Sequence, residues 1–212
     1  MKSAFLSFLF IVTFYEFACA QRVALGFRIG AAYNMYRGSD WIAFRDFEGE
    51  GVTSTKIGPA AGIFVNSMLS EFFWIKTDFM YINRGFIHTV DHIRLQQNEH
   101  YIDAYPLSPT FHFRGFQFFA GPSISAFFFN SYQKYDSDAE KVKTDRRRDP
   151  HRRLLEFGLM TGIEYETDFG LNFGLRYVHP FTSMYNRIND ISIHWYNQSL
   201  ILSAGFSIGR DK

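Results

Sequence analysis

The sequence predicts an all-β chain that folds as an eight-stranded antiparallel up-and-down transmembrane β-barrel. Aromatic residues make up 19% of the chain, with 26 Phe and 12 Tyr, yet the mean hydropathy is only −0.14. Large apolar residues must therefore alternate with polar ones, as they do when one face of each strand meets lipid and the other lines a polar interior. Such alternation runs through most of the chain, and the connections between the alternating segments are short and long in turn.

The first predicted strand is the stretch "RVALGFRIGAAYNMY", residues 22–36. Leu25, Phe27 and Ile29 fall on one face of an extended chain, whereas Gly26 and Arg28 fall on the other. A helix would mix these two sets, and its several glycines would be costly. The pattern therefore predicts a strand with one row of lipid-facing side chains.

Seven further segments repeat this alternation and set charged residues against aromatic and aliphatic rows. After the N-terminus no apolar run reaches 18 residues, so we expect no transmembrane helix. The seven predicted strands span residues 57–68, 72–83, 101–114, 116–129, 155–167, 171–178 and 195–209.

The connections differ in length in a regular way. Three are tight turns, at 69–71, 114–116 and 168–170, and four are longer, at 37–56, 84–100, 130–154 and 179–194. Outer-membrane barrels place short turns in the periplasm and long loops outside the cell. A soluble lipocalin-like barrel is the alternative, but it would direct its apolar side chains inward. Here the face opposite the apolar one carries charge, glycine and serine, which favours the membrane barrel.

The N-terminus resembles a secretory signal. Lys2 precedes an apolar segment at 4–15, and Ala18-Cys19-Ala20 gives a small-x-small cleavage pattern. We expect a signal peptide at 1–20 and a barrel domain at 21–212 that begins with Gln21. The alternative is a lipid anchor on Cys19, although Glu16 stands where a lipobox needs an aliphatic residue. Cleavage after Ala20 removes the chain's one cysteine, so no disulfide is expected.

Four motifs occur in an order that resembles the PorT-like outer-membrane β-barrel family of Bacteroidota. They are "TDFMYINRG", "YIDAYPLSPTF", "FFAGPSISAFF" and "EFGLMTGIEYE", and the resemblance covers about residues 22–208. It implies an eight-stranded barrel in the outer membrane. The family's name-giving member is tied to type IX secretion, but most members have no assigned activity, so the resemblance informs the fold more than the function.

Two prolines predict irregularities in the strands. Asp103 is expected to face inward, and so are Thr110 and His112, which requires a switch of parity between them. We therefore predict a β-bulge near Tyr105-Pro106, where a residue without a backbone donor fits well. Pro122 lies inside another predicted strand and should cause a local bulge or a missing hydrogen bond.

The inward faces carry charges of both signs, which we interpret as a salt-bridged plug because isolated buried charge is very costly. An eight-stranded barrel has an interior just wide enough to be filled by side chains. The alternative is a narrow gated pore or a proton-responsive site. The predicted lumen residues are Arg28, Lys76, Asp78, Asp103, His112, Arg114, Glu156, Glu164 and Arg176.

Two loop segments are candidate contact sites. The stretch "KVKTDRRRDPHRR" could bind lipopolysaccharide phosphates or an acidic patch on a partner, because Arg chelates phosphate in a bidentate way; the alternative is a solvated loop. In the first loop, an apolar group suggests a packed loop or a docking surface. The residues of the basic set are Arg146, Arg147, Arg148, Arg152 and Arg153, and those of the apolar set are Trp41, Ile42, Phe44 and Phe47.

Other clusters do not support a catalytic or metal site. His88, His92 and His100 lie near one another in the sequence, but nothing in the pattern makes them converge on a metal. His179 with Ser183 shows no diagnostic spacing for a lipid-modifying enzyme, and nor does His194 with Ser192. We therefore expect no enzyme activity, no metal and no cofactor.

The leading prediction for function is a plugged barrel in the outer membrane that serves as an accessory subunit of a larger assembly for secretion, insertion or uptake. The alternatives are a narrow gated channel and, third, a lipid-A-modifying enzyme. The expected partners are outer-membrane lipid, lipopolysaccharide and other outer-membrane or periplasmic proteins. The net charge of +1 gives no reason to expect a nucleic acid.

Overall fold

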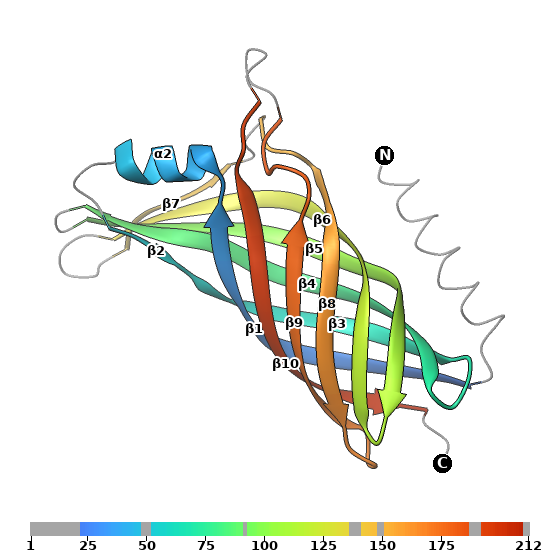
Figure 1. Cartoon of the computed structure of the whole chain (residues 1–212). Helices are drawn as coiled ribbons and strands as arrows, with labels where there is room; N and C mark the ends of the chain where they lie inside the picture. The colour runs from blue at the N-terminus through green and yellow to red at the C-terminus, as the bar shows by residue number, and fades with distance from the viewer. Residues whose placement is uncertain are drawn as a thin grey trace.

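The computed structural model is an eight-stranded antiparallel ring with two further strands attached (Figure 1), so the predicted fold class is confirmed. It describes residues 22–47, 52–90, 93–135, 141–147, 151–186 and 192–209, without the side chains of 44–47 and 141–147. The ring runs β1-β3-β4-β5-β6-β8-β9-β10 and closes between β10 and β1. The strands are β1 (Arg22–Arg37), β2 (Val52–Thr55), β3 (Ile57–Met68), β4 (Phe73–Val90), β5 (Ile93–Phe113), β6 (Phe116–Tyr135), β7 (Lys141–Arg147), β8 (Leu155–Glu166), β9 (Leu171–Pro180) and β10 (Tyr196–Ile208).

The barrel is apolar outside and polar inside. On β1, Phe27 and Ile29 are 54% and 67% exposed, whereas Arg28 between them is 1% exposed. The same inversion recurs on the other strands of the ring, whose exposed large side chains are mostly apolar and whose buried ones include charged residues such as Lys76 and Asp78. A soluble barrel would have the opposite arrangement. The lipocalin-like alternative is therefore wrong.

The short turns gather at one end of the barrel, which we call the turn end. They lie at 69–72, 114–115 and 167–170, and β1 begins and β10 ends on the same side (Figure 1). The turn between β5 and β6 has positive φ at both Arg114 (49°) and Gly115 (85°). Two such residues match the twist of a two-residue hairpin. Arg114 is therefore a turn residue, exposed to solvent, and not a lumen residue as the sequence predicted.

The opposite end, the loop end, contains more strand than predicted. The expected loop at 84–100 is almost wholly strand, because β4 continues to Val90 and β5 begins at Ile93. The expected loop at 130–154 contains the end of β6 and all of β7. With β2, these segments form a sheet in the order β2-β4-β5-β6-β7, the extension sheet, which projects beyond the ring (Figure 1). In the projecting parts of these strands polar residues occupy both faces, as in "RLQQNE" of β5, so the alternation that revealed the barrel strands is weak there.

A helix, α2 (Ser39–Phe47), follows β1 at the loop end. Its first turn is held by Ile42 N, which donates to Gly38 O at 3.1 Å, and Asp40 accepts a bond of 2.5 Å from the backbone N of His194. Within the described part of the chain, no helix is long and apolar enough to cross a membrane.

The predicted bulge is confirmed in β5. Thr77 of β4 lies opposite both Pro106 and Leu107, because the pairing register shifts by one residue there. Leu107 has a φ of 50°, and its backbone N donates to Thr77 Oγ1 at 3.0 Å. The inward row accordingly switches from Tyr105 to Ser108, both of which are buried.

The expected irregularity at Pro122 is also present. The β5–β6 pairing is interrupted between the pairs Ala104/Ile124 and Thr110/Phe119, and Pro122 lies within this interruption. The β6–β8 pairing runs through Pro122 without a break. The missing donor is thus accommodated where the ladder is already broken by the bulge of β5.

Deleting Leu107 should prevent folding of the barrel. Without the bulge, residues 108–113 would turn their polar row toward lipid and Phe111 and Phe113 inward. The measurement is the heat-modifiable shift on a gel that reports folded barrels, and the deletion variant should show only the unfolded band. Leu107→Gly is the control, because it keeps both the residue count and the positive φ, and it should fold. A deletion variant that folds like the wild type would contradict the role of the bulge.

Candidate functional site

The lumen on the turn side holds a network that we call the turn-side cluster. Asp78 lies 3.1 Å from both Arg28 and Arg176, and it accepts a hydrogen bond from Arg176. Glu164 contacts Arg28 at 2.8 Å, Lys76 at 3.0 Å and Arg176 at 3.4 Å. Gln117 extends the network by accepting from Lys76 at 2.8 Å and donating to Glu166 at 2.6 Å. Three cations thus face three carboxylates, namely Arg28, Lys76, Arg176, Asp78, Glu164 and Glu166, all buried.

Glycines in the wall make room for the aromatic rings that support these cations. A Cβ on Gly26 would lie 2.2 Å from the ring of Phe64, and one on Gly162 would lie 2.6 Å from the ring of Phe119. The Arg28 guanidinium lies 4.1 Å from the centre of the Phe64 ring. The Lys76 ammonium and the Arg176 guanidinium lie 4.8 and 5.1 Å from the centre of the Phe119 ring. The rings therefore fill the lumen and stabilise the cations by cation–π contact.

A second network, the loop-side cluster, lies farther along the lumen. Arg84 binds Asp103 at 2.5 Å and approaches Glu156 to 4.0 Å. Tyr105 donates to Asp103 at 2.8 Å, and Tyr101 donates to Glu156 at 2.7 Å. These hydrogen bonds satisfy carboxylate oxygens that would otherwise be costly to bury.

Arg152 completes the loop-side cluster from the segment before β8. Its guanidinium binds Glu99 at 2.7 Å and the Tyr101 hydroxyl at 2.6 Å. Tyr36 donates to Glu99 at 3.1 Å. The prediction of Arg152 as an exposed lipid or partner contact is therefore wrong, because its side chain is buried in an ion pair inside the barrel.

An apolar layer separates the two clusters. Along β4, Met80 and Ile82 lie between Asp78 and Arg84, and along β8 Met160 lies between Glu164 and Glu156. Rings and aliphatic side chains from the six other strands of the ring complete the layer. The buried residues of this cluster are Ala32, Ala60, Met80, Ile82, Tyr105, Phe119, Met160, Val178 and Ile201.

The structure places the predicted lumen residues as follows. Seven lie in the two clusters, but His112 lies at the turn end, where its ring stacks on Trp74 at 4.6 Å. Arg84, Glu99 and Arg152 were not among the predicted lumen residues because the sequence assigned them to loops, and Glu166 was also missed although it lies within the predicted strand 155–167. The seven are Arg28, Lys76, Asp78, Asp103, Glu156, Glu164 and Arg176.

The predicted apolar docking residues divide between a packed cluster and the surface. Trp41 is buried against Tyr36, Phe86 and Trp195, with ring centres 4.9, 5.4 and 5.0 Å away. Trp41 therefore belongs to a packed group at the loop end and is not an exposed docking residue. Ile42 is 49% exposed. The group, which we call the mouth cap, consists of Tyr36, Trp41, Phe86, Met184, Tyr185 and Trp195.

Several predicted contact residues lie outside what the structure describes. The side chains of Phe44, Phe47, Arg146 and Arg147 are not described, and Arg148 is not described at all. Arg153 is partly buried.

The histidines do not converge on a metal among the described residues. His88 contacts Thr53 Oγ1 at 2.8 Å, and His100 contacts the Tyr81 hydroxyl at 2.7 Å. The two histidines belong to opposite faces of the sheet, as their strand pairs show. His92 lies outside the described residues.

The histidine–serine pairs considered for catalysis are engaged elsewhere. His179 contacts Gln198 at 2.8 Å, and Ser183 donates to the carbonyl oxygen of Trp195 at 3.2 Å. His194 lies 3.8 Å from Asp40.

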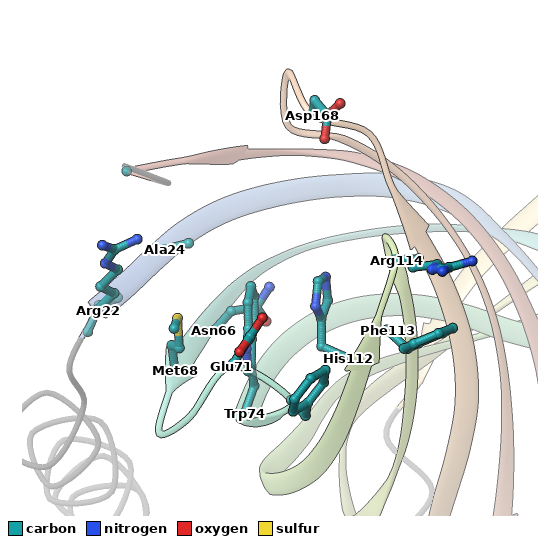
Figure 2. Close-up of a pocket in the computed structure, with 13 residues that line it drawn as sticks. Arg22, Ala24, Asn66, Met68, Glu71, Trp74, His112, Phe113, Arg114 and Asp168 are labelled. Atoms are coloured by element: carbon teal, nitrogen blue, oxygen red, sulfur yellow. The ribbon is translucent and has the colours of Figure 1, made fainter. Parts of the chain in front are cut away.

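A cavity of about 690 Å³ opens at the turn end, and we call it the vestibule (Figure 2). Its walls include the stacked pair Trp74 and His112, and its rim carries charged side chains of both signs. Asn66 of β3 also lines it and is 2% exposed. Neither amide atom of Asn66 has a hydrogen-bond partner among the described residues. The full lining is Arg22, Val23, Ala24, Asn66, Met68, Glu71, Phe72, Trp74, His112, Phe113, Arg114, Asp168 and Gly209.

Comparison with known families identifies one match. The family described as "Outer membrane protein beta-barrel domain" matches residues 17–186, which is most of the chain. No curated protein matches the sequence.

Solved structures of similar fold include three small bacterial outer-membrane proteins. The attachment invasion locus protein Ail of Yersinia pestis, in complex with the heparin analogue sucrose octasulfate, is 12% identical with a TM-score of 0.47, over 89% of this chain and 100% of that one. Neisserial surface protein A is 10% identical with a TM-score of 0.45, over 87% and 99%. OprG of Pseudomonas aeruginosa is 8% identical with a TM-score of 0.41, over 89% and 97%. Because every one of these scores lies below 0.5, none bears on function.

The turn-side cluster predicts a large effect of removing one carboxylate. Glu164→Gln leaves three cations facing two carboxylates, so we expect the free energy of unfolding to fall by about 3–5 kcal/mol. The measurement is urea unfolding of the refolded barrel in lipid vesicles. Asp168→Asn is the control, since Asp168 is exposed in a turn, and it should change the free energy by less than about 0.5 kcal/mol. Equal effects of the two substitutions would contradict the assignment of Glu164 as the centre of the cluster.

Proposed function

We propose that this chain, which belongs to the outer membrane protein beta-barrel domain family, is a non-conducting accessory subunit of a larger outer-membrane assembly. The protein itself is a small integral outer-membrane β-barrel. The assembly would serve secretion, insertion or uptake, and the subunit would act through its two ends and carry no catalytic activity of its own.

The observation that carries this proposal is the filled lumen. Two networks of ion pairs and the apolar layer between them occupy the interior, and the mouth cap packs at the loop end. Opening a path for ions would require breaking buried ion pairs, each of which is strongly destabilising to break. A closed barrel with elaborated ends is better suited to binding than to transport.

The proposal includes an orientation and a targeting route. In this family of folds, short turns are periplasmic and long connections are extracellular, so the turn end and both ends of the mature chain would face the periplasm. A signal peptide at 1–20 would direct export, and the barrel domain would then begin at Gln21. The motif order supports a closer relation to PorT-like proteins of Bacteroidota, which stays a proposal.

The proposed contacts at the loop end are electrostatic. β7 is the outer strand of the extension sheet and pairs with β6 alone among the described strands. Its sequence, "KVKTDRR", has four cations in seven residues and is followed by Arg148. Arginine binds phosphate oxygens in a bidentate way, so this edge would contact lipopolysaccharide or an acidic protein partner.

The filled lumen predicts the absence of ion conduction. Protein refolded from inclusion bodies, which contain no native porins, should give no discrete current steps in planar bilayers. The Leu107 deletion, which should not fold, provides the background. Discrete steps from the folded protein alone would contradict the plug and favour the narrow channel.

The basic edge predicts weaker binding to lipopolysaccharide after its arginines are removed. Arg146→Ser, Arg147→Ser and Arg148→Ser together should weaken binding roughly 10- to 100-fold, at about 0.5–1 kcal/mol for each exposed charge. The measurement is the retention of the barrel on vesicles with and without lipopolysaccharide. Arg22→Ser with Arg114→Ser, at the turn end, is the control and should leave retention unchanged. Equal retention of all variants would remove lipopolysaccharide as a ligand of this edge.

A further inference from the structure

We propose that the vestibule binds a short peptide segment, in an extended conformation, from a partner protein of the assembly. This inference rests on the proposed function, because it needs a protein partner on the side of the turn end. The vestibule is a different surface from the basic edge, since the two lie at opposite ends of the barrel.

Asn66 is a buried side chain whose amide lacks hydrogen-bond partners among the residues that the structure describes. Its carboxamide offers two donors and one acceptor oxygen, and in the described structure neither Nδ2 nor Oδ1 has a hydrogen-bond partner. The residue is nevertheless almost fully buried, and it lines the cavity (Figure 2). Burying an unpartnered amide is costly. A ligand that supplies both a donor and an acceptor would remove this cost.

The Asn66 carboxamide is complementary to the backbone of an extended peptide. A carboxamide presents N–H and C=O side by side, which matches the N–H and C=O groups that an extended peptide presents along its edge. A peptide unit next to Asn66 can therefore exchange two hydrogen bonds with it. Segments that bind in this way gain affinity from the main chain and specificity from pockets for their side chains.

The walls of the vestibule are partly apolar and its rim is charged. Ala24, Met68 and Phe72 supply apolar surface for one side chain of the segment. Arg114 and Glu71 supply charges of opposite sign at the rim. The vestibule therefore fits a segment with an apolar residue flanked by charged ones. Its volume lies within the range of pockets that bind small ligands, about 300–1,000 Å³.

A glycan fits the vestibule less well than a peptide. Sugar rings pack on an open aromatic face, but Trp74 is only 7% exposed and one face of its indole is covered by the stacked ring of His112. The observations therefore favour a peptide, and a glycan becomes an outcome of the test.

The experiment selects peptides against the full-length mature barrel in lipid nanodiscs. A phage library of random 12-residue peptides is the probe, and selected peptides are synthesised and titrated by fluorescence anisotropy. We expect peptides with an apolar residue between charged ones, and Asn66→Leu should weaken their binding at least tenfold. The same substitution should raise the temperature of unfolding, because it replaces an unpartnered polar group by an apolar one of similar size.

The matched control is Asn34→Leu. Asn34 is also fully buried, but it lies toward the loop end and is hydrogen-bonded to Ala32 O, Lys56 O and Ser199 Oγ. Its replacement should lower the temperature of unfolding and leave peptide affinity unchanged. Opposite effects of the two substitutions on both readouts would support a binding role for Asn66 over a structural one.

Three results would overturn the inference. They are a failure to select any peptide, equal affinity of the selected peptides for wild type and Asn66→Leu, and displacement of the peptides by tri-N-acetylchitotriose.

Purification from the native membrane in mild detergent separates this inference from the proposed function. A companion protein that stays with Asn66→Leu as firmly as with the wild type leaves the accessory role standing and excludes the vestibule as the site that holds this companion. Absence of any companion from the wild type counts against the accessory role itself.

Discussion

The pairing of charge inside the barrel is the constraint on which the rest of the structure depends. Three cations and three carboxylates on the turn side come from β1, β4, β8 and β9, and Gln117 of β6 links Lys76 to Glu166. A shift of one residue in any of these strands would turn its charged side chains toward lipid and leave the others unpaired. The ion pairs therefore fix the register of most of the ring, and the lipid-facing row of Phe, Leu and Ile follows from it.

The size of the lumen determines how these charges are packed. Eight strands enclose a space that side chains can fill, yet arginine and phenylalanine cannot stack within it if every wall position carries a side chain. Gly26 and Gly162 solve this by letting Phe64 and Phe119 lie against the backbone, with cations over the ring faces. Glycine usually destabilises the interior of a strand, but at these two positions its missing side chain provides the space that an aromatic ring occupies in the lumen.

The sequence predicted the strands where one face meets lipid, and it failed where neither face does. The strands at 57–68 and 155–167 agree with the structure to within one residue at each end, since their apolar rows alternate without interruption. The extension sheet was missed because "RLQQNE" has no such row. Arg84 and Glu99 were consequently assigned to a loop. Arg152 was missed for another reason: the clustering of charges in the sequence does not reveal which one of them turns inward.

Three strands are much longer than crossing a membrane requires. A strand needs about 9–11 residues to cross a bilayer, whereas β4, β5 and β6 contain 18, 21 and 20 residues. Their additional length builds the extension sheet, which contributes nothing to crossing the membrane. The wall is occupied by lipid and the lumen by ion pairs, and the mouth cap packs at the loop end. The two proposed binding surfaces, the extension sheet and the vestibule, therefore lie at opposite ends of the barrel, so a partner would recognise the ends of the barrel and not its interior.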